Sequence, residues 1–428
     1  MKIVRFPEIR QWEELCLRPQ LNHEQLYDKV RLILDKVRDE GDKAVMEYER
    51  MFDHASLSSL LVSEEEKTVA LSSIDHNLMD AIILAHDNIR RFHEAQSFTP
   101  LHVTTAEGVD CWQRSVPISN VGLYIPGGTA PLFSTVLMLA TPAKIAGCPN
   151  IVMCTPPNAN GRVNSAIIAA AHVAGVDTIV KAGGVQAIGA MAYGTQSVPK
   201  VNKIFGPGNQ YVMAAKQLVG GECTAIDMPA GPSEVCVIAD KTSHPAFVAA
   251  DLLSQAEHGP DSHVMLITDC EMMMNKVVDE VKRQLDELPR KEIAARALDN
   301  SVCILMNSID EAIALSNTYA PEHLIIATDD ADTLAHKVVN AGSVFLGHWA
   351  CESAGDYASG TNHTLPTHGW AKAYSGVNLD SFCRKITFQH LSEIGVSNIG
   401  PAVALMARTE QLEAHARAMD VRMEKLNS

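Results

Sequence analysis

The chain has 428 residues, 46% of them hydrophobic and 20% charged, a balance typical of a folded globular protein rather than a disordered one. The 35 Lys and Arg residues against 51 Asp and Glu residues give a formal net charge of −16, which disfavours binding to nucleic acids and anionic membranes. The sequence contains no run of about 18 apolar residues and no signal-peptide pattern at its N-terminus, so we expect a cytoplasmic protein.

The first 110 residues are predicted to be helical. Apolar residues recur at helical spacing after Gln25 and are interrupted at Gly41. Asn22 with Gln25, and Ser63 with Glu66, have the pattern of capping boxes at helix N-termini. A third, long amphipathic helix is predicted over residues 75–96.

From residue 121 onward, short apolar runs alternate with helical segments in two successive series. This alternation predicts right-handed βαβ units and parallel sheets that are covered on both faces. The first series contains a predicted helix at 132–146 and strands at 121–125, 151–154, 178–180 and 203–205. The second series begins after Ser233, with strands at 235–238, 264–268, 302–305, 324–327 and 344–346. The tail from residue 381 is predicted to be helical, in pieces separated at Gly395, Gly400 and Pro401.

The expected fold class is therefore α/β, with two doubly wound domains and helical extensions at both ends. Ligands of such folds bind at the carboxyl ends of strands, where glycine-rich turns let the backbone approach. The segment Gly206-Pro207-Gly208-Asn209-Gln210-Tyr211 begins like a dinucleotide fingerprint but ends in Tyr, and Asp227 downstream belongs to a separate loop. No G-x-x-x-x-G-K-[ST] phosphate loop is present, so any nucleotide site is non-standard.

One candidate metal site lies at the end of a predicted helix. Gln255 and His258 share a helix face with Asp251, and His, carboxylate and amide groups suit zinc. From the residue types alone, Asp251 is a better candidate ligand than Gln255, and a polar helix C-terminus with a dipole-stabilised His is the alternative. The ten cysteines form no C-x-x-C pair and are expected to be reduced, so no thiolate zinc site is predicted.

Three further segments are candidates for chemistry. Glu322 and His323 directly precede a predicted strand and offer two bases of different pKa, provided that a loop turns both the same way; an exposed polar turn is the alternative. Residues 352–367 form a polar stretch without helical or strand period, and we expect a ligand-binding loop there. Glu410 and His415, in the tail, are about 140° apart around a helix, and two solvated residues are the simpler interpretation.

Taken together, these segments resemble one family, histidinol dehydrogenase. The resemblance covers nearly the whole chain, and its matching stretches are residues 122–131, 205–209, 227–234, 251–258, 320–324 and 355–363. It implies a four-electron oxidation of L-histidinol to L-histidine through bound L-histidinaldehyde. The implied cofactors are NAD+ and one zinc ion per subunit.

The resemblance also implies roles for individual residues. Zinc is expected on Gln255, His258, Asp356 and His415, so Gln255 replaces Asp251. Glu322 and His323 are the expected catalytic bases, and Tyr124, Gln186 and Asn209 the expected NAD contacts. The expected substrate contacts are Ser233, Gln255, His258, His323, Asp356, Glu410 and His415, with His363 as an additional candidate. Val185 and Cys351 depart from the Ala and Pro that are more usual at these positions in the family.

The resemblance implies incomplete Rossmann-like domains and a homodimer in which Glu410 and His415 reach the site of the other subunit. The expected divisions are an N-terminal helical arm (1–26), a first α/β domain with the metal and substrate site (27–122 and 233–376), a second α/β domain on the NAD side (123–232) and a C-terminal helical dimerisation tail (377–428). Three alternatives remain: a relative that oxidises another amino or sulfonated alcohol, a zinc hydrolase or lyase without NAD, and a non-catalytic protein.

Overall fold

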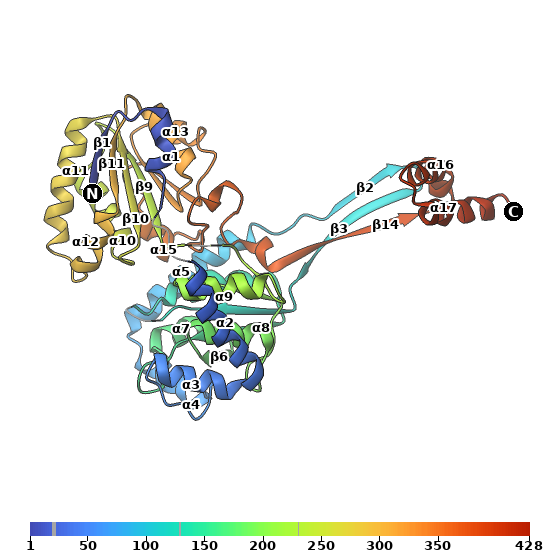
Figure 1. The fold of residues 1–428 in the computed structure, drawn as a ribbon, viewed down its shortest axis with the longest axis horizontal. Coiled ribbons are helices and arrows are strands. Elements are labelled where there is room, and N and C mark those ends of the chain that lie inside the picture. Colours follow the sequence, from blue (N-terminus) through green and yellow to red (C-terminus); the bar gives the residue numbers. More distant parts are fainter. Residues whose placement is uncertain (19–22, 128–129, 230) are drawn as a thin grey trace.

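A computed structural model describes residues 1–18, 23–127, 130–229 and 231–428 (Figure 1). The predicted cap residue Asn22 lies outside the described residues. The second predicted capping box is confirmed, because the Ser63 hydroxyl accepts the Glu66 N–H (3.1 Å) and the Glu66 carboxylate accepts the Ser63 N–H (2.8 Å). Across the ranges that the structure describes, no helix is long and apolar enough to cross a membrane.

The larger sheet has six parallel strands, in the spatial order β1 (Lys2–Arg5), β11 (Val302–Leu305), β10 (His263–Thr268), β9 (Glu234–Ala239), β12 (His323–Ala327) and β13 (Ser343–Leu346). Alternate residues of β9 pack into two hydrophobic layers, one on each face. One face is covered by α10 (Pro245–Ala256), α11 (Glu271–Leu285) and α12 (Lys291–Asp299), and the other by α1 (Trp12–Leu15), α13 (Ile309–Tyr319) and α14 (Ala331–Ala335). This is the doubly wound arrangement expected from the sequence.

The second sheet has five parallel strands, in the order β6 (Thr178–Lys181), β5 (Asn150–Thr155), β4 (Asn120–Tyr124), β7 (Lys203–Phe205) and β8 (Ala225–Ile226). One face packs on α4 (Glu64–Ser73), α5 (His76–Glu94), α6 (Phe133–Ile145) and α7 (Ser165–Val173). The other packs on α2 (His23–Glu40), α3 (Asp42–Phe52), α8 (Gly184–Tyr193) and α9 (Gln210–Gly220). The helices of residues 23–94 therefore belong to this core, whereas the expected division had grouped residues 27–122 with residues 233–376.

The N-terminal segment is not purely helical, as had been expected for residues 1–26. It contains the strand β1, which pairs in parallel with β11 at the edge of the larger sheet, in the register Lys2↔Val302. A strand of four residues is too short to show a period, and its partner lies about 300 residues further along the chain. After β1 the chain passes through α1 to Arg18, which brings this residue close to β9.

A three-stranded antiparallel ribbon projects from the two sheet domains and carries the C-terminal helices at its tip (Figure 1). It is built from β14 (Cys383–Leu391), β3 (Val109–Pro117) and β2 (Leu101–Ala106), followed by α16 (Glu393–Thr409) and α17 (Glu413–Leu426). The prediction of helix at residues 101–110 and 383–391 is wrong, because β2 and β14 are strands that pair with β3 from either side. The predicted breaks at Gly395, Gly400 and Pro401 are also wrong, since α16 contains all three.

Candidate functional site

The two candidate bases, Glu322 and His323, lie together at the start of β12. Ala320 ends α13 in the left-handed conformation (φ 53°), and the chain bends at Glu322 before the strand begins. As a result both side chains turn to the same side, with His323 Nδ1 3.8 Å from Glu322 Oε2. Both are buried. The condition set by the sequence, that a loop must turn both residues the same way, is met.

Two more carboxylates surround His323. Its Nδ1 lies 3.9 Å from Glu352 Oε1, and its Nε2 lies 3.4 Å from Asp356 Oδ1. Burial alone would lower the pKa of His323, but Glu352, Glu322 and Asp356 outweigh it and raise that pKa to about 10. Burial raises the pKa of Glu322 to about 8, against the opposing effect of His323. The cluster thus gathers three carboxyl groups around one imidazole.

His258, Glu352 and Asp356 can hold a cation. One donor atom from each of them lies within 4.8 Å of the others, and imidazole with carboxylate oxygens is a donor set that suits zinc. Asp356 Oδ1 is buried and makes no hydrogen bond within the described ranges. An acceptor buried in this way is costly unless a cation or donor meets it. The residues present therefore fit a divalent metal ion, while Asp251 is outside this group.

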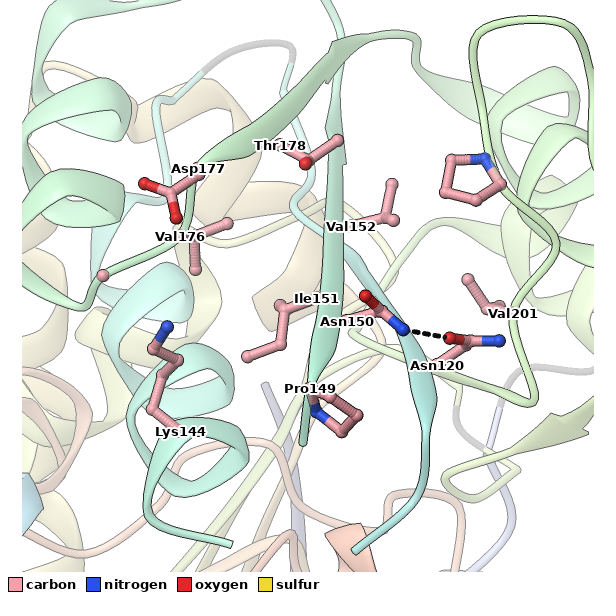
Figure 2. A pocket seen from close by; sticks show the side chains of 12 residues that line it. Asn120, Lys144, Pro149, Asn150, Ile151, Val152, Val176, Asp177, Thr178 and Val201 are labelled. Carbon is pink, nitrogen blue, oxygen red and sulfur yellow. Dashed lines mark hydrogen bonds between the residues drawn. The ribbon is translucent and has the colours of Figure 1, made fainter. Parts of the chain in front are cut away.

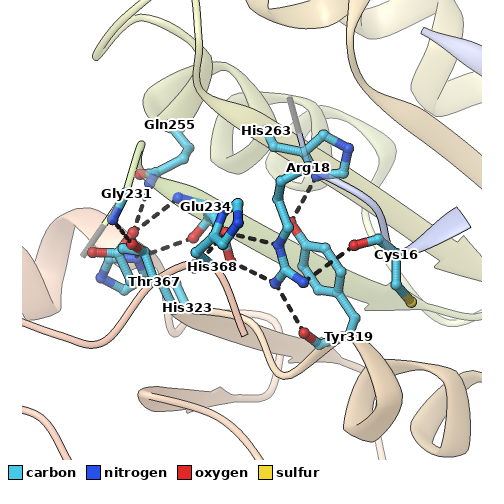
Figure 3. A network of polar contacts seen from close by, with 11 residues as sticks. Cys16, Arg18, Gly231, Glu234, Gln255, His263, Tyr319, His323, Thr367 and His368 are labelled. Atoms are coloured by element: carbon cyan, nitrogen blue, oxygen red, sulfur yellow. Dashed lines mark hydrogen bonds and ion pairs between the residues drawn. The ribbon is translucent and has the colours of Figure 1, made fainter. Parts of the chain in front are cut away.

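Gln255 is buried beside the same carboxylates. When its amide is oriented by its hydrogen-bond partners, the nitrogen donates to Glu352 Oε1, and the oxygen shares the Glu234 N–H (2.7 Å) with Glu322 Oε2. Ligation of a metal through the amide oxygen requires the opposite orientation, in which the oxygen faces the carboxylates. Either orientation keeps Gln255 in contact with the cluster, on the end of α10 where the sequence had located it (Figure 3).

The cluster lies at the amino ends of β9 and β12, not at the carboxyl ends expected for a doubly wound sheet. Ser233 and Glu322 come directly before these strands, and Ser233 O accepts the His263 N–H (3.0 Å). Glu352 and Asp356 come from α15 (Glu352–Tyr357), so the prediction of a loop throughout residues 352–367 is wrong at its beginning. Glu352 lies within the expected binding loop but was not among the expected site residues. Its i, i+4 spacing to Asp356 was the available signal, because this spacing aligns two side chains only in a helix.

His363 links the cluster to the five-stranded sheet domain. Its Nδ1 lies 2.9 Å from the Asp356 carbonyl oxygen, and its Nε2 lies 3.1 Å from the Thr135 hydroxyl on α6. The neighbouring Asn362 donates to the Met138 carbonyl oxygen on the same helix (2.6 Å). The segment that carries Asp356 and His363 is therefore anchored to both domains.

The three expected NAD contacts gather at the carboxyl ends of the five-stranded sheet. Tyr124 ends β4, and its hydroxyl accepts the Gly184 N–H (3.1 Å) beyond β6. Gln186 lies in the first turn of α8, and Asn209 caps α9 by accepting the Tyr211 N–H (3.0 Å). These three residues therefore lie at the end of the sheet where ligands of doubly wound folds bind.

A buried carboxyl that the sequence analysis missed lies beneath the turn before α8. Glu49 Oε1 accepts the Gly183 N–H (2.9 Å) and the Gln186 side-chain amide (2.7 Å). Burial raises the pKa of Glu49 to about 8, although both hydrogen bonds oppose this shift. The signal was its position four residues after the buried Val45, on the apolar stripe of an amphipathic helix.

The partial fingerprint turn is fixed by a buried ion pair. The Lys216 ammonium binds Asp227 Oδ1 (2.5 Å) and the Gly206 carbonyl oxygen (2.7 Å), and Asp227 Oδ2 accepts the Gly206 N–H (2.8 Å). Gly206 has φ +126°, and a Cβ there would lie 2.1 Å from the Tyr124 carbonyl oxygen. Asp227 therefore holds the turn, and the residue is a structural partner of Lys216.

Two expected site residues are not brought to the cluster within one chain. Glu410 and His415 are exposed at the tip of the ribbon, on the helical hairpin of α16 and α17. Figure 1 shows that this tip extends far from both sheets. If they reach a site of this kind, it is in a second copy of the chain.

A cavity of about 330 Å³ lies at the opposite end of the five-stranded sheet (Figure 2). Its lining includes Asn120, Asn150 and Thr178, the first residues of β4, β5 and β6. Asn150 donates to Asn120 Oδ1 (2.7 Å), so these two amides satisfy each other. None of the expected site residues lines this cavity, and we do not assign the chemistry to it.

Comparisons with known proteins agree with this geometry. A family model described as histidinol dehydrogenase matches residues 16–423. The chain belongs to the histidinol dehydrogenase family. Histidinol dehydrogenase of Bacteroides thetaiotaomicron is 62% identical over 426 residues, with 100% of both chains covered. The chloroplastic histidinol dehydrogenase of Arabidopsis thaliana is 48% identical over 433 residues, covering 100% of this chain and 92% of the other.

A solved structure supports the same family. The crystal structure of histidinol dehydrogenase from Elizabethkingia anophelis has a TM-score of 0.98 and 52% identity, and the match covers 100% of this chain and 99% of that one. The resemblance found from the sequence is confirmed, and with it the α/β fold. The expectation of an oxidoreductase of histidine biosynthesis is confirmed by the same membership.

Proposed function

We propose that the chain oxidises L-histidinol to L-histidine through bound L-histidinaldehyde and reduces two NAD+ for each substrate molecule. Family membership supports the reaction class. The observation that carries the proposal is the buried pair of Glu322 and His323 next to the His258, Glu352 and Asp356 donor set. This arrangement brings two proton-transferring groups and a cation site to one place.

His323 is the group that we assign to the alcohol step. Its Nε2 is buried and makes no hydrogen bond in the described parts of the chain. In the neutral imidazole, which a cation bound beside the carboxylates would favour, this nitrogen can accept the hydroxyl proton while hydride leaves the carbinol carbon. Its Nδ1 faces the Glu234 carbonyl oxygen at 3.4 Å. This backbone contact orients the ring and leaves Nε2 for the substrate.

Glu322 is the group that we assign to the aldehyde step. Glu322 Oε2 accepts the Glu234 N–H, which leaves the other oxygen to take a proton from water. Water activated in this way adds to the aldehyde and gives a gem-diol that can lose a second hydride. Because Glu322 is buried, its carboxylate is a stronger base than a solvated one.

Zinc is the cofactor that we propose for the donor set. Gln255, His258 and Asp356 would hold it, with His415 from a second copy of the chain and Glu352 adjacent. Zinc bound there would hold the amino and hydroxyl groups of the substrate and offset the carboxylate charge that raises the pKa of His323. The chain's own part is to orient these ligands at the end of α10, in the turn that follows it and on α15.

NAD+ is proposed to bind at the carboxyl ends of the five-stranded sheet, at Tyr124, Gln186 and Asn209. The glycines of the neighbouring turns support this site, since a Cβ at Gly206 would collide with the backbone of Tyr124. His363 and Thr135 connect the two domains beside the cluster. A cofactor on one domain can thereby be held against a substrate on the other.

A homodimer is proposed to complete the substrate site with Glu410 and His415. Exposed apolar side chains on the helical hairpin support it, among them Leu405 (67% exposed) and Met406 (65% exposed). In a homodimer, the second subunit would cover these side chains. Ser233 is the remaining proposed substrate contact, beside Glu234 at the start of β9.

One measurement tests the reaction. The purified protein, loaded with zinc and supplied with L-histidinol and NAD+, should form two NADH for each L-histidine produced. One NADH per substrate would indicate release of the aldehyde, and no NADH would favour a hydrolase, a lyase or a non-catalytic protein. NADH formation from another amino alcohol or a sulfonated alcohol, with none from histidinol, would indicate a relative with a changed substrate.

A further inference from the structure

An arginine near the N-terminus lies directly behind the proposed bases. The Arg18 guanidinium binds the Glu234 carboxylate with two hydrogen bonds, from Nε to Oε1 (2.9 Å) and from Nη2 to Oε2 (2.8 Å) (Figure 3). The two side chains are 10% and 1% exposed. A bidentate pair that is buried to this degree has a fixed geometry.

The same guanidinium also holds the segment that leads to the bases. Nη2 donates to the Tyr319 carbonyl oxygen (2.8 Å), three residues before Glu322, and the guanidinium stacks on the Tyr319 ring at 3.8 Å. Nη1 donates to the Cys16 carbonyl oxygen (3.2 Å). Arg18 thus joins the start of β9 to the end of α13, two segments that lie far apart in the sequence.

The backbone of Glu234 contacts both proposed bases. Its N–H donates to Glu322 Oε2 (2.8 Å), and its carbonyl oxygen lies 3.4 Å from His323 Nδ1. The side chain of Glu234 also accepts the His368 N–H (2.7 Å). A shift of the Glu234 backbone would therefore change the direction of the Glu322 carboxylate and of the His323 ring together.

We propose that Arg18 and Glu234 are a positioning pair that sets the relative orientation of Glu322 and His323. The inference rests on the roles proposed for those two residues. Neither Arg18 nor the Glu234 side chain needs to touch the substrate. Because β1 and α1 bring Arg18 to this place, the N-terminal segment is part of the catalytic architecture rather than only the edge of a sheet.

The test compares Arg18→Lys with wild type in the zinc-loaded protein. Lys keeps the charge but lacks the planar fork, so it cannot hold Glu234 and the Tyr319 carbonyl oxygen together. We expect kcat per folded site to fall by about 100-fold, as for small misplacements of reacting groups. KM for histidinol should change by less than about threefold, since most of the proposed substrate contacts, among them His258, Asp356 and Glu410, lie outside this pair.

Arg5→Met is the matched control. Arg5 lies on β1 of the same N-terminal segment and pairs with Glu271 at the surface, where the side chains are 48% and 57% exposed. Its loss should leave both kcat and KM unchanged. In an Arg18→Ala variant, added ethylguanidinium should restore part of kcat, which a general loss of folded protein would not allow. If Arg18→Ala does not fold, the Arg18→Lys result decides alone.

A readout without turnover separates this inference from the reaction. The imidazole ¹⁵N signals of His323, assigned with His323→Gln, should shift in Arg18→Lys and not in Arg5→Met. Unshifted signals with kcat within about twofold of wild type would overturn the positioning role and leave the proposed reaction intact. If the signals shift in Arg18→Lys but the wild-type protein fails to oxidise histidinol, the positioning pair is supported and the proposed reaction is rejected.

Discussion

The backbone N–H of Glu234 donates to Glu322 Oε2 at 2.8 Å, so one oxygen of this proposed base is fixed by the chain itself. The amide of Gln can accept the same hydrogen bond. Glu322→Gln is consequently a substitution that keeps the shape of the site and removes only its basicity.

We expect Glu322→Gln to separate the two half-reactions. Oxidation of supplied L-histidinaldehyde should fall by about 10²–10⁴-fold, the range of a lost general base. Reduction of the same aldehyde by NADH needs no hydration and should be far less affected. Stopped-flow measurement of NADH in both directions checks this. Equal losses in both directions would assign Glu322 a role other than hydration.

Removal of metal should abolish turnover and leave the fold intact. The proposed ligands are on α10, α15 and the tail, while each sheet has its own apolar layers on both faces. Prolonged chelation should leave the far-ultraviolet circular dichroism nearly unchanged, and added zinc should restore activity. His258→Asn should not recover with zinc, whereas Asp251→Asn, one turn before Gln255 on α10, should. Unfolding on chelation would contradict this prediction.

Mixing two inactive variants tests the shared site. If His415 acts in the other subunit, His258→Asn and His415→Asn put their defects in opposite sites of a mixed dimer. Random exchange makes half of the dimers mixed, each with one intact site of two, so activity should recover to about a quarter of wild type. Two affinity tags show that exchange has occurred. With exchange demonstrated, activity that stays at the level of the separate variants would rule out a ligand from the other subunit.

Glu49→Gln should change how stability depends on pH. The pKa of Glu49 is about 8 in the folded chain and near the ordinary 4.5 when unfolded, so the folded state binds this proton more tightly. Its stabilising contribution is complete below about pH 4.5 and is lost as the pH rises through 8. The free energy of unfolding of the variant, relative to wild type, should therefore increase from about pH 5 to about pH 8.

Urea unfolding at several pH values measures this difference. Glu47→Gln is the control on the same helix, because Lys36 at 2.7 Å lowers the pKa of Glu47. The pKa of Glu47 is shifted in the opposite direction to that of Glu49. The contribution of Glu47 to stability is therefore already complete at pH values above its pKa in the unfolded chain. A difference for Glu49→Gln that stays flat with pH would mean that Glu49 is ionised in the folded protein.

Gly206→Ala should destabilise the protein much more than Gly147→Ala. Both glycines have positive φ, but a Cβ meets nothing within 4 Å at Gly147 and the Tyr124 carbonyl oxygen at Gly206. The conformational cost alone is about 1 kcal/mol, and the collision at Gly206 adds to it. Thermal unfolding of both variants gives the comparison. Equal losses would show that the Gly206 turn relaxes freely.

Much of the fold follows from local patterns in the sequence. The helix predicted at 132–146 is α6, and the strand predicted at 264–268 lies within β10, because hydrophobic period and length specify such elements. β14 was missed because both faces of a projecting ribbon carry polar residues, so its alternation is weak. β1 was missed because its pairing with β11 is not a local property.

The site residues could be predicted less well from residue types alone than from the resemblance to a family. Residue types alone favoured Asp251, and only the family pattern pointed to Gln255, which the structure brings into contact with Glu352. Glu352 could be predicted as a neighbour of Asp356 only if residues 352–357 were known to form a helix. Arg18 and Glu234 are separated by 216 positions, and no motif connects them.

The pairing of β1 with β11 also constrains the order in which the protein can be assembled. During synthesis, β1 has no neighbour in its sheet until residues 302–305 have been made. At about 5–20 residues per second, that interval is roughly 15–60 s. Throughout translation of the intervening chain, β1 must stay unpaired and clear of other strand edges, which makes it a segment for chaperones to protect.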